Sequence, residues 1–530
     1  MKNFFCILLI GLYFGSIAQT KDEPKANWQN LDLKQDGVFG ISTERAYSEL
    51  LSGKKGVSVI VAVIDGGVDI HHEDLREKIW VNTKEIVGNG IDDDHNGYID
   101  DVNGWDFIGS PKENVQYDNL ELVRLVRKMQ PKYATALNSS KYSDTERKEL
   151  TEYQKLVVKY MDELQNAEMG FAQMALFDKT IDQIVAKMDK SDPVLHDFAN
   201  YSPANDIEKK VVKIVKSELA KKKDFKKVDE EIKDGFKYYN AKVNYHLNID
   251  FDPRSIVGDD YSNSNERIYG NNDVTGPDAQ HGTHVSGIIA ASRTNNVGIL
   301  GVSDNAHIMA VRVVPDGDER DKDVANGIRY AVDNGAKIIN MSFGKGYSWD
   351  KKVVDEAVKY AISKDVLLVH AAGNDSENTE QTDNYPNRQF IDTLDVKKGE
   401  VIPWIEVGAS GWKDDEDLIA NFSNYGKKTV DVFAPGVKIK STIPNSLYKE
   451  ENGTSMAAPV VSGLAALIRS YYPKLTAIQV KNVIMNSVST VSHKVKIKMD
   501  DGSQKMLLGD ICVSGGIVNA YKALQLAEKM

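Results

Sequence analysis

The chain has 530 residues, of which 41 % are hydrophobic and 27 % are charged, so it can bury a large core and is not disordered by composition. Its formal net charge of −12 argues against nucleic acid as a partner and is compatible with a calcium-dependent exported protein. The length alone suggests about two to four domains, or one large domain that carries an insertion.

Residues 1–18 have the pattern of a cleaved signal peptide. The apolar run FFCILLIGLYF follows Lys2, and Ser16 and Ala18 come next in a small-x-small arrangement. This run is too short to span a bilayer, and no later stretch predicts a transmembrane segment. Cys512 is the one cysteine outside the signal, so no intramolecular disulfide is expected. We therefore expect export, with a periplasmic or secreted destination.

Residues 19–114 are predicted to form the first part of an α/β domain. The run VSVIVAVIDGGV, residues 57–68, is continuously apolar and ends in an acid and two glycines. This pattern is typical of a buried parallel strand that delivers Asp65 to a loop at its carboxyl end. Functional residues collect beyond the carboxyl ends of such strands.

The acidic stretch NGIDDDHNGYIDD, residues 89–101, is a candidate Ca²⁺ site. Side-chain oxygens recur at every second position around a glycine turn, as in loops that wrap calcium. Asn103 stands where a full EF-hand loop has its last glutamate, and an acidic solvated turn is the alternative interpretation. The expected ligands are Asp92, Asp94, Asn96, the Tyr98 carbonyl, and Asp101 or its neighbour Asp100.

Residues 115–248 differ from the rest because they are rich in Lys, Glu and Asp and lack strand-like runs. Ser143 and Glu146 make a capping box at the start of a predicted helix. Apolar residues then recur in steps of three and four, which predicts an inserted helical hairpin or bundle with an aromatic core. The two seams contain Leu150, Tyr153, Val157, Tyr160, Leu164, Ala167, Phe171 and Met174, then Phe225, Val228, Ile232, Phe236, Tyr239 and Val243.

Residues 249–530 are predicted to complete the α/β domain. The strand-like runs HIMAVRVV, AKIINMSF, VLLVHAAG and WIEVGAS alternate with amphipathic stretches at 322–334 and 351–363, which indicates a mainly parallel sheet. Further on, GTSMAAPVVSG places Ser455 near the start of an apolar helix, where free N–H groups face a developing negative charge. The small neighbours leave room for a substrate backbone, although a tightly packed helix has the same pattern.

Three segments together offer the groups of a nucleophilic site. A serine hydroxyl needs a base, and a histidine base needs a carboxylate that holds its tautomer. Ser455, His281 in QHGTHVSG and Asp65 supply these groups, although each alone is compatible with a structural role. We expect His284, one helical turn further on, to be a packed histidine.

The motifs VIDGGVD, HGTHVSG, GTSMAAP and AAGND resemble those of the subtilisin-like serine peptidases, over about residues 55–110 and 250–525. The order Asp65, His281, Ser455 is that of the subtilisin type. The resemblance implies that Asp65 orients the histidine, that His281 is general base and then acid, and that Ser455 is the nucleophile. Asn374 in AAGND is then the oxyanion-hole asparagine.

The resemblance also implies a three-layer subtilisin-like domain with a mainly parallel sheet, interrupted by the all-α insertion. Gly66 follows Asp65 where the family usually has a hydroxyl residue, so one hydrogen bond to the carboxylate is expected to be missing. Phe343 is expected to shape one wall of the S1 pocket. The residues expected to line an extended substrate backbone are Ser342, Phe343, Gly344, Ala372 and Gly373.

The function implied by the resemblance is that of an exported serine endopeptidase, which cleaves polypeptide substrates through an acyl-enzyme intermediate. One alternative is a non-catalytic binding protein that retains the fold. Another is an exported scaffold that docks a protein partner through the helical insertion. The sequence leaves the substrate and the preferred P1 residue open.

Overall fold

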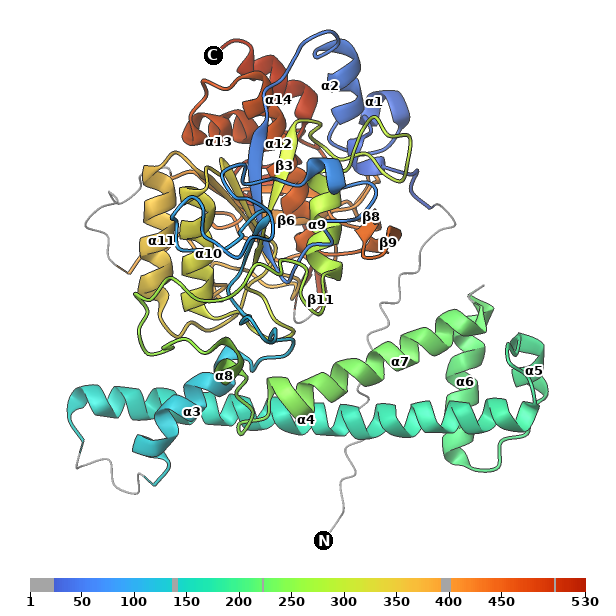
Figure 1. Cartoon of the computed structure of the whole chain (residues 1–530). Coiled ribbons are helices and arrows are strands. Elements are labelled where there is room, and N and C mark those ends of the chain that lie inside the picture. The colour runs from blue at the N-terminus through green and yellow to red at the C-terminus, as the bar shows by residue number, and fades with distance from the viewer. Residues whose placement is uncertain (1–22, 136–141, 222–223, 392–401, 500–501) are drawn as a thin grey trace.

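The structure is a computed structural model that describes residues 23–135, 142–221, 224–391, 402–499 and 502–530. An α/β body and an elongated helical insertion, which lies along one side of the body, make up the described chain (Figure 1). The signal peptide predicted at residues 1–18 lies outside the described residues. Among the helices that are described, none combines the length and the apolarity needed to cross a bilayer.

A seven-stranded, entirely parallel sheet forms the centre of the body, in the order β2-β3-β1-β4-β5-β6-β7. Its strands are β1 (Val59–Asp65), β2 (Gly104–Asp106), β3 (Ala306–Arg312), β4 (Ile338–Met341), β5 (Leu367–Ala371), β6 (Trp404–Ser410) and β7 (Val432–Pro435). Two antiparallel hairpins lie outside this sheet: β8 (Ile439–Ile443) with β9 (Leu447–Glu451), and β10 (Val495–Met499) with β11 (Gly502–Met506).

Helices cover both faces of the sheet, which explains the continuous apolar run in β1. Val61 and Val63 share one core with α9 (Gln280–Ala290), α12 (Thr454–Tyr471), α13 (Ala477–Asn486) and α14 (Ala520–Ala527). Ala62 and Ile64 point to the opposite face and share a core with α10 (Asp321–Asp333) and α11 (Lys351–Ser363). The predicted three-layer α/β fold is confirmed.

Shorter elements connect these layers. They are η1 (Trp28–Asn30), α1 (Leu33–Asp36), α2 (Thr43–Glu49), η2 (Arg76–Lys78), α8 (Arg254–Val257) and η5 (Leu508–Asp510). The segments before β1 and after β11 pack on each other, because α2 and α14 are in contact.

The insertion is helical, as predicted. It contains α3 (Glu121–Tyr133), α4 (Asp144–Met188), α5 (Leu195–Asn200), α6 (Asp206–Ala220), α7 (Phe225–Ala241) and the π-helical turn η4 (Lys242–His246). The capping box of Ser143 and Glu146 begins α4. The apolar seam of α4 packs near its start on α3 and further along on α5, α6 and α7, in two separate clusters. The boundaries at residues 115 and 248 stay a prediction.

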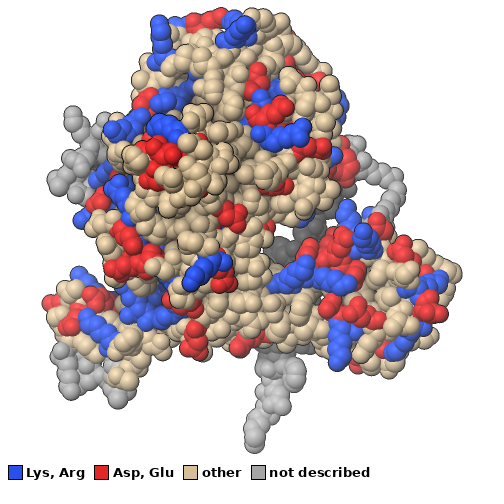
Figure 2. Space-filling model, in the orientation of Figure 1, with Lys and Arg blue, Asp and Glu red and all other residues tan. Residues whose placement is uncertain are grey.

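Charged side chains cover the outer sides of these helices. Figure 2 shows Lys and Arg interspersed with Asp and Glu over the visible face of the insertion. Several of these charges pair one helical turn apart, as in Lys159–Glu163 and Asp229–Lys233. The apolar seam therefore faces inward, and the solvated sides are the ones that other molecules can reach.

Candidate active site

The predicted site residues gather at one edge of the sheet. Because neighbouring parallel strands end at the same edge, the carboxyl ends of β1, β4 and β5 bring Asp65, Ser342 and Ala372 to one region. The N-terminal ends of α9 and α12 add His281 and Ser455. Segments that are far apart in the chain thus meet in one place.

Asp65 and His281 form a close pair. The ring Nδ1 of His281 lies 2.8 Å from Oδ1 and 3.0 Å from Oδ2 of Asp65. Asp65 is buried, whereas 42 % of the His281 side chain is exposed. Gly282 permits this approach, because a Cβ there would lie 2.2 Å from the carbonyl oxygen of Gly67. The Asp65 carboxylate therefore binds Nδ1 of the ring and leaves Nε2 able to accept or donate a proton.

Backbone and a buried arginine support the Asp65 carboxylate. The N–H of Gly66 donates to Oδ1 of Asp65 at 2.7 Å, so this residue contributes through its backbone although it lacks a hydroxyl. Arg312 donates from Nε to the Gly66 carbonyl at 2.8 Å and forms a buried ion pair with Asp106 at 2.9 Å. Sequence reasoning did not single out Arg312, but a lone cation inside the apolar run HIMAVRVV was the available signal.

The charges around His281 favour the imidazolium form. Partial burial is the largest single influence and lowers its pKa, but the charge and hydrogen bond of Asp65 and the charges of Glu451 and Asp278 outweigh it. Together they raise the pKa of His281 to about 9. Burial instead lowers the pKa of His284 to about 4, and this ring bonds the Lys449 carbonyl at 3.0 Å, as expected of a packed histidine.

This electrostatic setting predicts an alkaline pH profile. Only the neutral imidazole accepts a proton, so kcat/KM should rise about tenfold per pH unit below a midpoint near pH 9 and then level off. The change Glu451→Gln removes a charge that raises the pKa of His281, so the midpoint should move to lower pH. The measurement is the initial rate of cleavage of a chromogenic peptide at low substrate concentration across pH 6 to about pH 11.

The matched control is Glu450→Gln, one residue earlier on β9. Adjacent residues on a strand point to opposite faces, and the side chain of Glu450 is exposed. Its removal should leave the midpoint in place. Equal shifts in the two variants would contradict the contribution assigned to Glu451.

Ser455 is the second residue of α12, so its backbone N–H has no acceptor within the helix. Its Oγ donates to the carbonyl of Ser342 at 3.1 Å, and the Ser342 hydroxyl donates back to the Ser455 carbonyl at 2.9 Å. The Asn340 side-chain amide donates to the same Ser342 hydroxyl at 2.9 Å. Buried polar groups thus lock the end of β4 to the start of α12.

Asn374 is held beside the same helix end. Its Oδ1 accepts from the backbone N–H of Thr454 at 2.9 Å and from the Thr454 hydroxyl at 3.0 Å. With the amide oxygen anchored, Nδ2 lies near the start of α12, 3.7 Å from where a Cβ on Gly453 would be. The amide nitrogen of Asn374 and the backbone N–H of Ser455 therefore both lie at the start of α12. Sequence reasoning missed Thr454, which anchors this amide.

The segments after β4 and β5 form two walls, 342–344 and 372–373. Phe343 is half-buried and contacts the ring of His370 edge-on, at a centroid distance of 6.4 Å. Asn384 lies between the walls: its amide donates to the carbonyls of Ala371 at 3.2 Å and Ala372 at 3.3 Å. A Cβ on Gly344 would come within 2.3 Å of the Asn384 Oδ1, so the glycine is needed for this contact. Nothing in the sequence pattern singled out Asn384.

The acidic loop brings a glutamate from outside its own motif. Carboxylate oxygens of Glu85, Asp92 and Asp94 all lie within 4.8 Å of one another. The Oε1 of Glu85 accepts from the backbone N–H groups of Asp93 and Asp94 at 3.0 and 3.1 Å. Its Oε2 is buried without a hydrogen-bond partner, so this oxygen is available to a cation.

The remaining predicted ligands have other contacts. The Oδ1 of Asn96 accepts from the Tyr98 backbone N–H at 2.8 Å, and the Tyr98 ring packs against Trp105. Asp101 is not in the carboxylate group, because it accepts from Asn82, Asn96 and Tyr330. Burial is the dominant influence on Asp101 and raises its pKa to about 6.

A sequence model of the subtilase family matches residues 56–507, which is most of the chain. The chain belongs to the subtilase family. The resemblance seen in the sequence motifs is therefore confirmed, and the relatives that the chain matches include a serine proteinase and several subtilisins. The match runs across the helical insertion and includes Asp65, His281, Asn374 and Ser455.

Individual relatives of this subtilase are similar over part of their length. The thermophilic serine proteinase of Bacillus sp. strain AK1 is 42 % identical over 192 residues, which are 36 % of this chain and 42 % of that protein. Subtilisin BL from Lederbergia lenta is 35 % identical over 212 residues, 40 % of this chain and 71 % of that protein. A solved protease structure from Pseudoalteromonas arctica covers 96 % of this chain and 100 % of its own, with 19 % identity and a TM-score of 0.49.

Proposed function

We propose that this subtilase is an exported endopeptidase that hydrolyses peptide bonds through Ser455, His281 and Asp65. One observation carries the proposal: three groups meet at the carboxyl ends of the strands. They are the buried carboxylate of Asp65 with its partner His281, Ser455 at a helix N-terminus, and the anchored amide beside it. Nucleophile, base and oxyanion donors are the groups that acyl transfer requires.

Attack begins when Ser455 exchanges its hydrogen bond with the Ser342 carbonyl for one with Nε2 of His281. The Oγ–H proton passes to Nε2 while Oγ forms a bond to the carbonyl carbon of the substrate. Asp65 accepts a hydrogen bond from Nδ1–H of His281 throughout and stabilises the imidazolium that forms. The carbonyl oxygen becomes an oxyanion, which accepts hydrogen bonds from Asn374 and from the Ser455 backbone.

The imidazolium then gives its proton to the leaving group, which completes the cleavage. It protonates the amide nitrogen of the leaving peptide, the C–N bond breaks, and the acyl group remains on Ser455. Water then enters, gives a proton to Nε2 of His281 and attacks the acyl carbon. The ester bond to Oγ breaks, His281 returns the proton to Oγ of Ser455, and the second product leaves as a carboxylic acid. The general-acid and general-base steps both use the same nitrogen, which the Asp65 contact leaves free.

The substrate backbone lies between the walls 342–344 and 372–373 in this proposal. Its extended backbone forms main-chain hydrogen bonds with the two walls, as an added strand would, and the side chain before the cleaved bond faces the region around Phe343. Export follows from the signal pattern of residues 1–18, with a periplasmic or secreted destination. The solvated sides of the helical insertion are the surface proposed to dock a protein partner.

Covalent labelling tests the catalytic proposal directly. A fluorophosphonate reacts with an activated serine, so wild-type protein should be labelled at Ser455 and should hydrolyse casein. A non-catalytic binding protein or scaffold with the same fold would show neither property. Mass spectrometry of the labelled peptide identifies the modified residue.

We also propose that the group of Glu85, Asp92 and Asp94 holds a structural Ca²⁺. Three carboxylates within 4.8 Å form a concentrated negative charge, and calcium prefers oxygen ligands in such loops. The buried, unpartnered Oε2 of Glu85 supports this assignment, because a bare carboxylate oxygen is costly to bury without a cation or donor. Asn96, the Tyr98 carbonyl and Asp101 stay predictions as further oxygen ligands of this ion.

Calcium removal is expected to lower the melting temperature. A ligand that binds the native state alone stabilises it by about 2.7 kcal/mol at a free concentration one hundred times Kd. The double change Glu85→Gln with Asp92→Asn should lower calcium stoichiometry, measured by elemental analysis, and abolish the response of the melting curve to chelator. Asp93→Asn is the matched control, because Asp93 lies in the same loop outside the carboxylate group. Retention of calcium by the double variant would contradict the ligand set.

A further inference from the structure

The two chain ends of the insertion meet on one segment of the body, residues 313–320, which connects β3 to α10. Asp118 donates from its backbone N–H to the Asp316 carbonyl at 3.0 Å, and the Asp316 N–H donates to the Gln116 carbonyl at 2.8 Å. At the other end of the insertion, His246 Nε2 lies 3.0 Å from Oδ1 of Asp316. We call residues 116–124 the insertion root.

A buried carboxylate of the root reaches across to the body. Glu121, the first residue of α3, is fully buried, and its Oε2 lies 2.6 Å from Nη2 of Arg124 and 2.8 Å from Nζ of Lys345. Burial is the largest influence and raises the pKa of Glu121, but Arg124 and Lys345 outweigh it and lower the pKa to about 2. Glu121 is therefore ionised throughout the working pH range.

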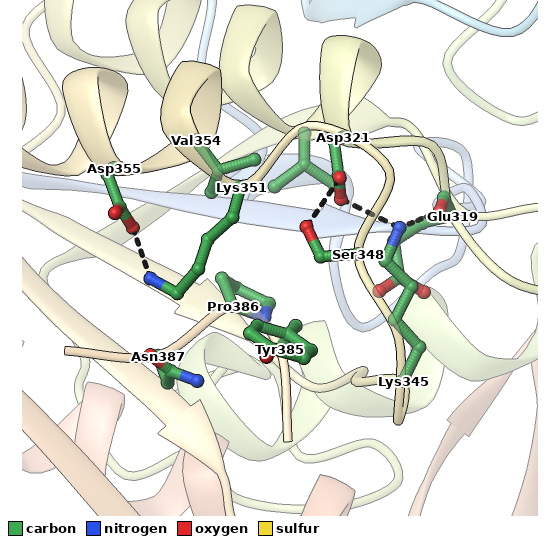
Figure 3. Close-up of a pocket in the computed structure, with 11 residues that line it drawn as sticks. Glu319, Asp321, Lys345, Ser348, Lys351, Val354, Asp355, Tyr385, Pro386 and Asn387 are labelled. Carbon is green, nitrogen blue, oxygen red and sulfur yellow. Dashed lines mark hydrogen bonds and ion pairs between the residues drawn. The ribbon is translucent and has the colours of Figure 1, made fainter. Parts of the chain in front are cut away.

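Lys345 is held from three directions. Besides Glu121, its Nζ lies 2.7 Å from Oδ1 of Asp321 and donates to the Glu319 carbonyl at 2.6 Å. Figure 3 shows Lys345 extending toward Asp321 and Glu319, in the region where Tyr385 and Pro386 also lie. An ammonium group has three N–H donors, so these three acceptors fix its position.

The backbone of Lys345 directly continues the substrate wall 342–344. Its N–H donates to the Tyr385 carbonyl at 3.1 Å, and the Tyr385 N–H donates back to its carbonyl at 2.9 Å. At the other end of the wall, Ser342 exchanges hydrogen bonds with Ser455. The wall is thus fixed at one end by Ser455 and at the other by Lys345, whose side chain forms an ion pair with Glu121 of the insertion.

We propose that Glu121 is a positioning residue, which sets the place of the substrate wall 342–344 through Lys345. The helical insertion is then coupled to substrate binding by its root, in addition to any contact that its outer surface makes. This inference rests on the proposed peptidase function. Glu121 does not touch the reacting atoms, so its loss should alter substrate affinity and leave the chemical steps intact.

The change Glu121→Gln tests the coupling, because it keeps the size of the side chain and removes its charge. For a chromogenic tetrapeptide that lies along the wall, KM should rise about tenfold while kcat stays within about twofold. The rate of fluorophosphonate labelling at Ser455 should not change, since this small reagent does not use the wall.

Glu208→Gln is the matched control. Glu208 is also a buried glutamate of the insertion, paired with Lys187 at 2.6 Å, but it belongs to α6, away from the root. A loss of stability alone should affect both variants, whereas the KM change should be confined to Glu121→Gln. Lys345→Met should raise KM as well, and the double variant with Glu121→Gln should show no further increase, because both changes break one connection.

Each outcome has a definite meaning. Equal KM values in Glu121→Gln, Glu208→Gln and wild type, or additive effects of the Glu121 and Lys345 changes, would overturn the positioning role. If Glu121→Gln does not fold, Glu121→Asp takes its place, because it retains the charge on a side chain too short to keep the contact with Lys345. Its KM should lie above the wild-type value with an unchanged labelling rate, and a wild-type KM would overturn the positioning role. Wild-type protein without fluorophosphonate labelling would contradict the proposed function itself.

Discussion

Replacement of Ser455 by alanine is expected to abolish peptide hydrolysis while the protein still folds. The change removes one oxygen from the start of α12, where the Ser342 carbonyl loses a single donor. Loss of the nucleophile leaves only binding and oxyanion stabilisation. In subtilisin, a member of this family, removal of the triad serine or histidine lowers kcat by about 10⁶-fold, and we expect the same order for Ser455→Ala and His281→Ala.

The measurement is casein hydrolysis by purified protein, accompanied by circular dichroism and a melting curve. The double variant Ser455→Ala with His281→Ala should be no less active than either single variant, because the groups act as one unit. Ser462→Ala serves as a control, since Ser462 lies on the same helix and bonds Asn340 rather than the reacting groups. Casein hydrolysis by Ser455→Ala at the wild-type rate would refute the assignment of the nucleophile.

Asn374→Ala is expected to lower kcat by about 10²- to 10³-fold with little change in KM. That magnitude is the one known for the corresponding amide of subtilisin rather than a value obtained from this structure. The physical reason for the split is that, in the proposed mechanism, the amide donates to the oxyanion, which exists in the transition state and not in the bound substrate. Thr454 holds the amide oxygen by two hydrogen bonds, so the donor is aligned before the substrate arrives.

Steady-state kinetics with a chromogenic peptide separate the two parameters. Asn378→Ala is the matched control, because Asn378 lies four residues further on in the same loop and caps the Glu380 backbone N–H. It should leave kcat unchanged. A variant Asn374→Ala whose loss appears in KM alone would show that the amide binds substrate uniformly and does not stabilise the oxyanion.

Much of the fold could be predicted because local patterns determine it. The apolar run of β1 is buried on both faces, so its continuous hydrophobicity indicates a parallel strand without any further information. The heptad seam and the capping box of Ser143 likewise predict the start and the packed side of α4. These features depend on residues that are close in sequence.

The contacts that support the site could not be predicted in the same way. Glu85 lies outside the acidic motif and joins Asp92 and Asp94 only because the chain turns back on itself. Asn384, between the two walls, has ordinary surroundings in the sequence, and the lone cation Arg312 in its apolar run does not reveal that it supports the Asp65 loop. Their roles come from partners hundreds or tens of residues away.

The sequence by itself determined the family of this protein, because its motifs and their order along the chain are those of the subtilases. Its periodicities also determined which segments are strands and which are helices. Only the tertiary structure decided how the insertion meets the body. The link from Glu121 to Lys345 joins residues 224 positions apart, and such a buried ion pair forms only where the fold removes both charges from water and places them 2.8 Å from each other.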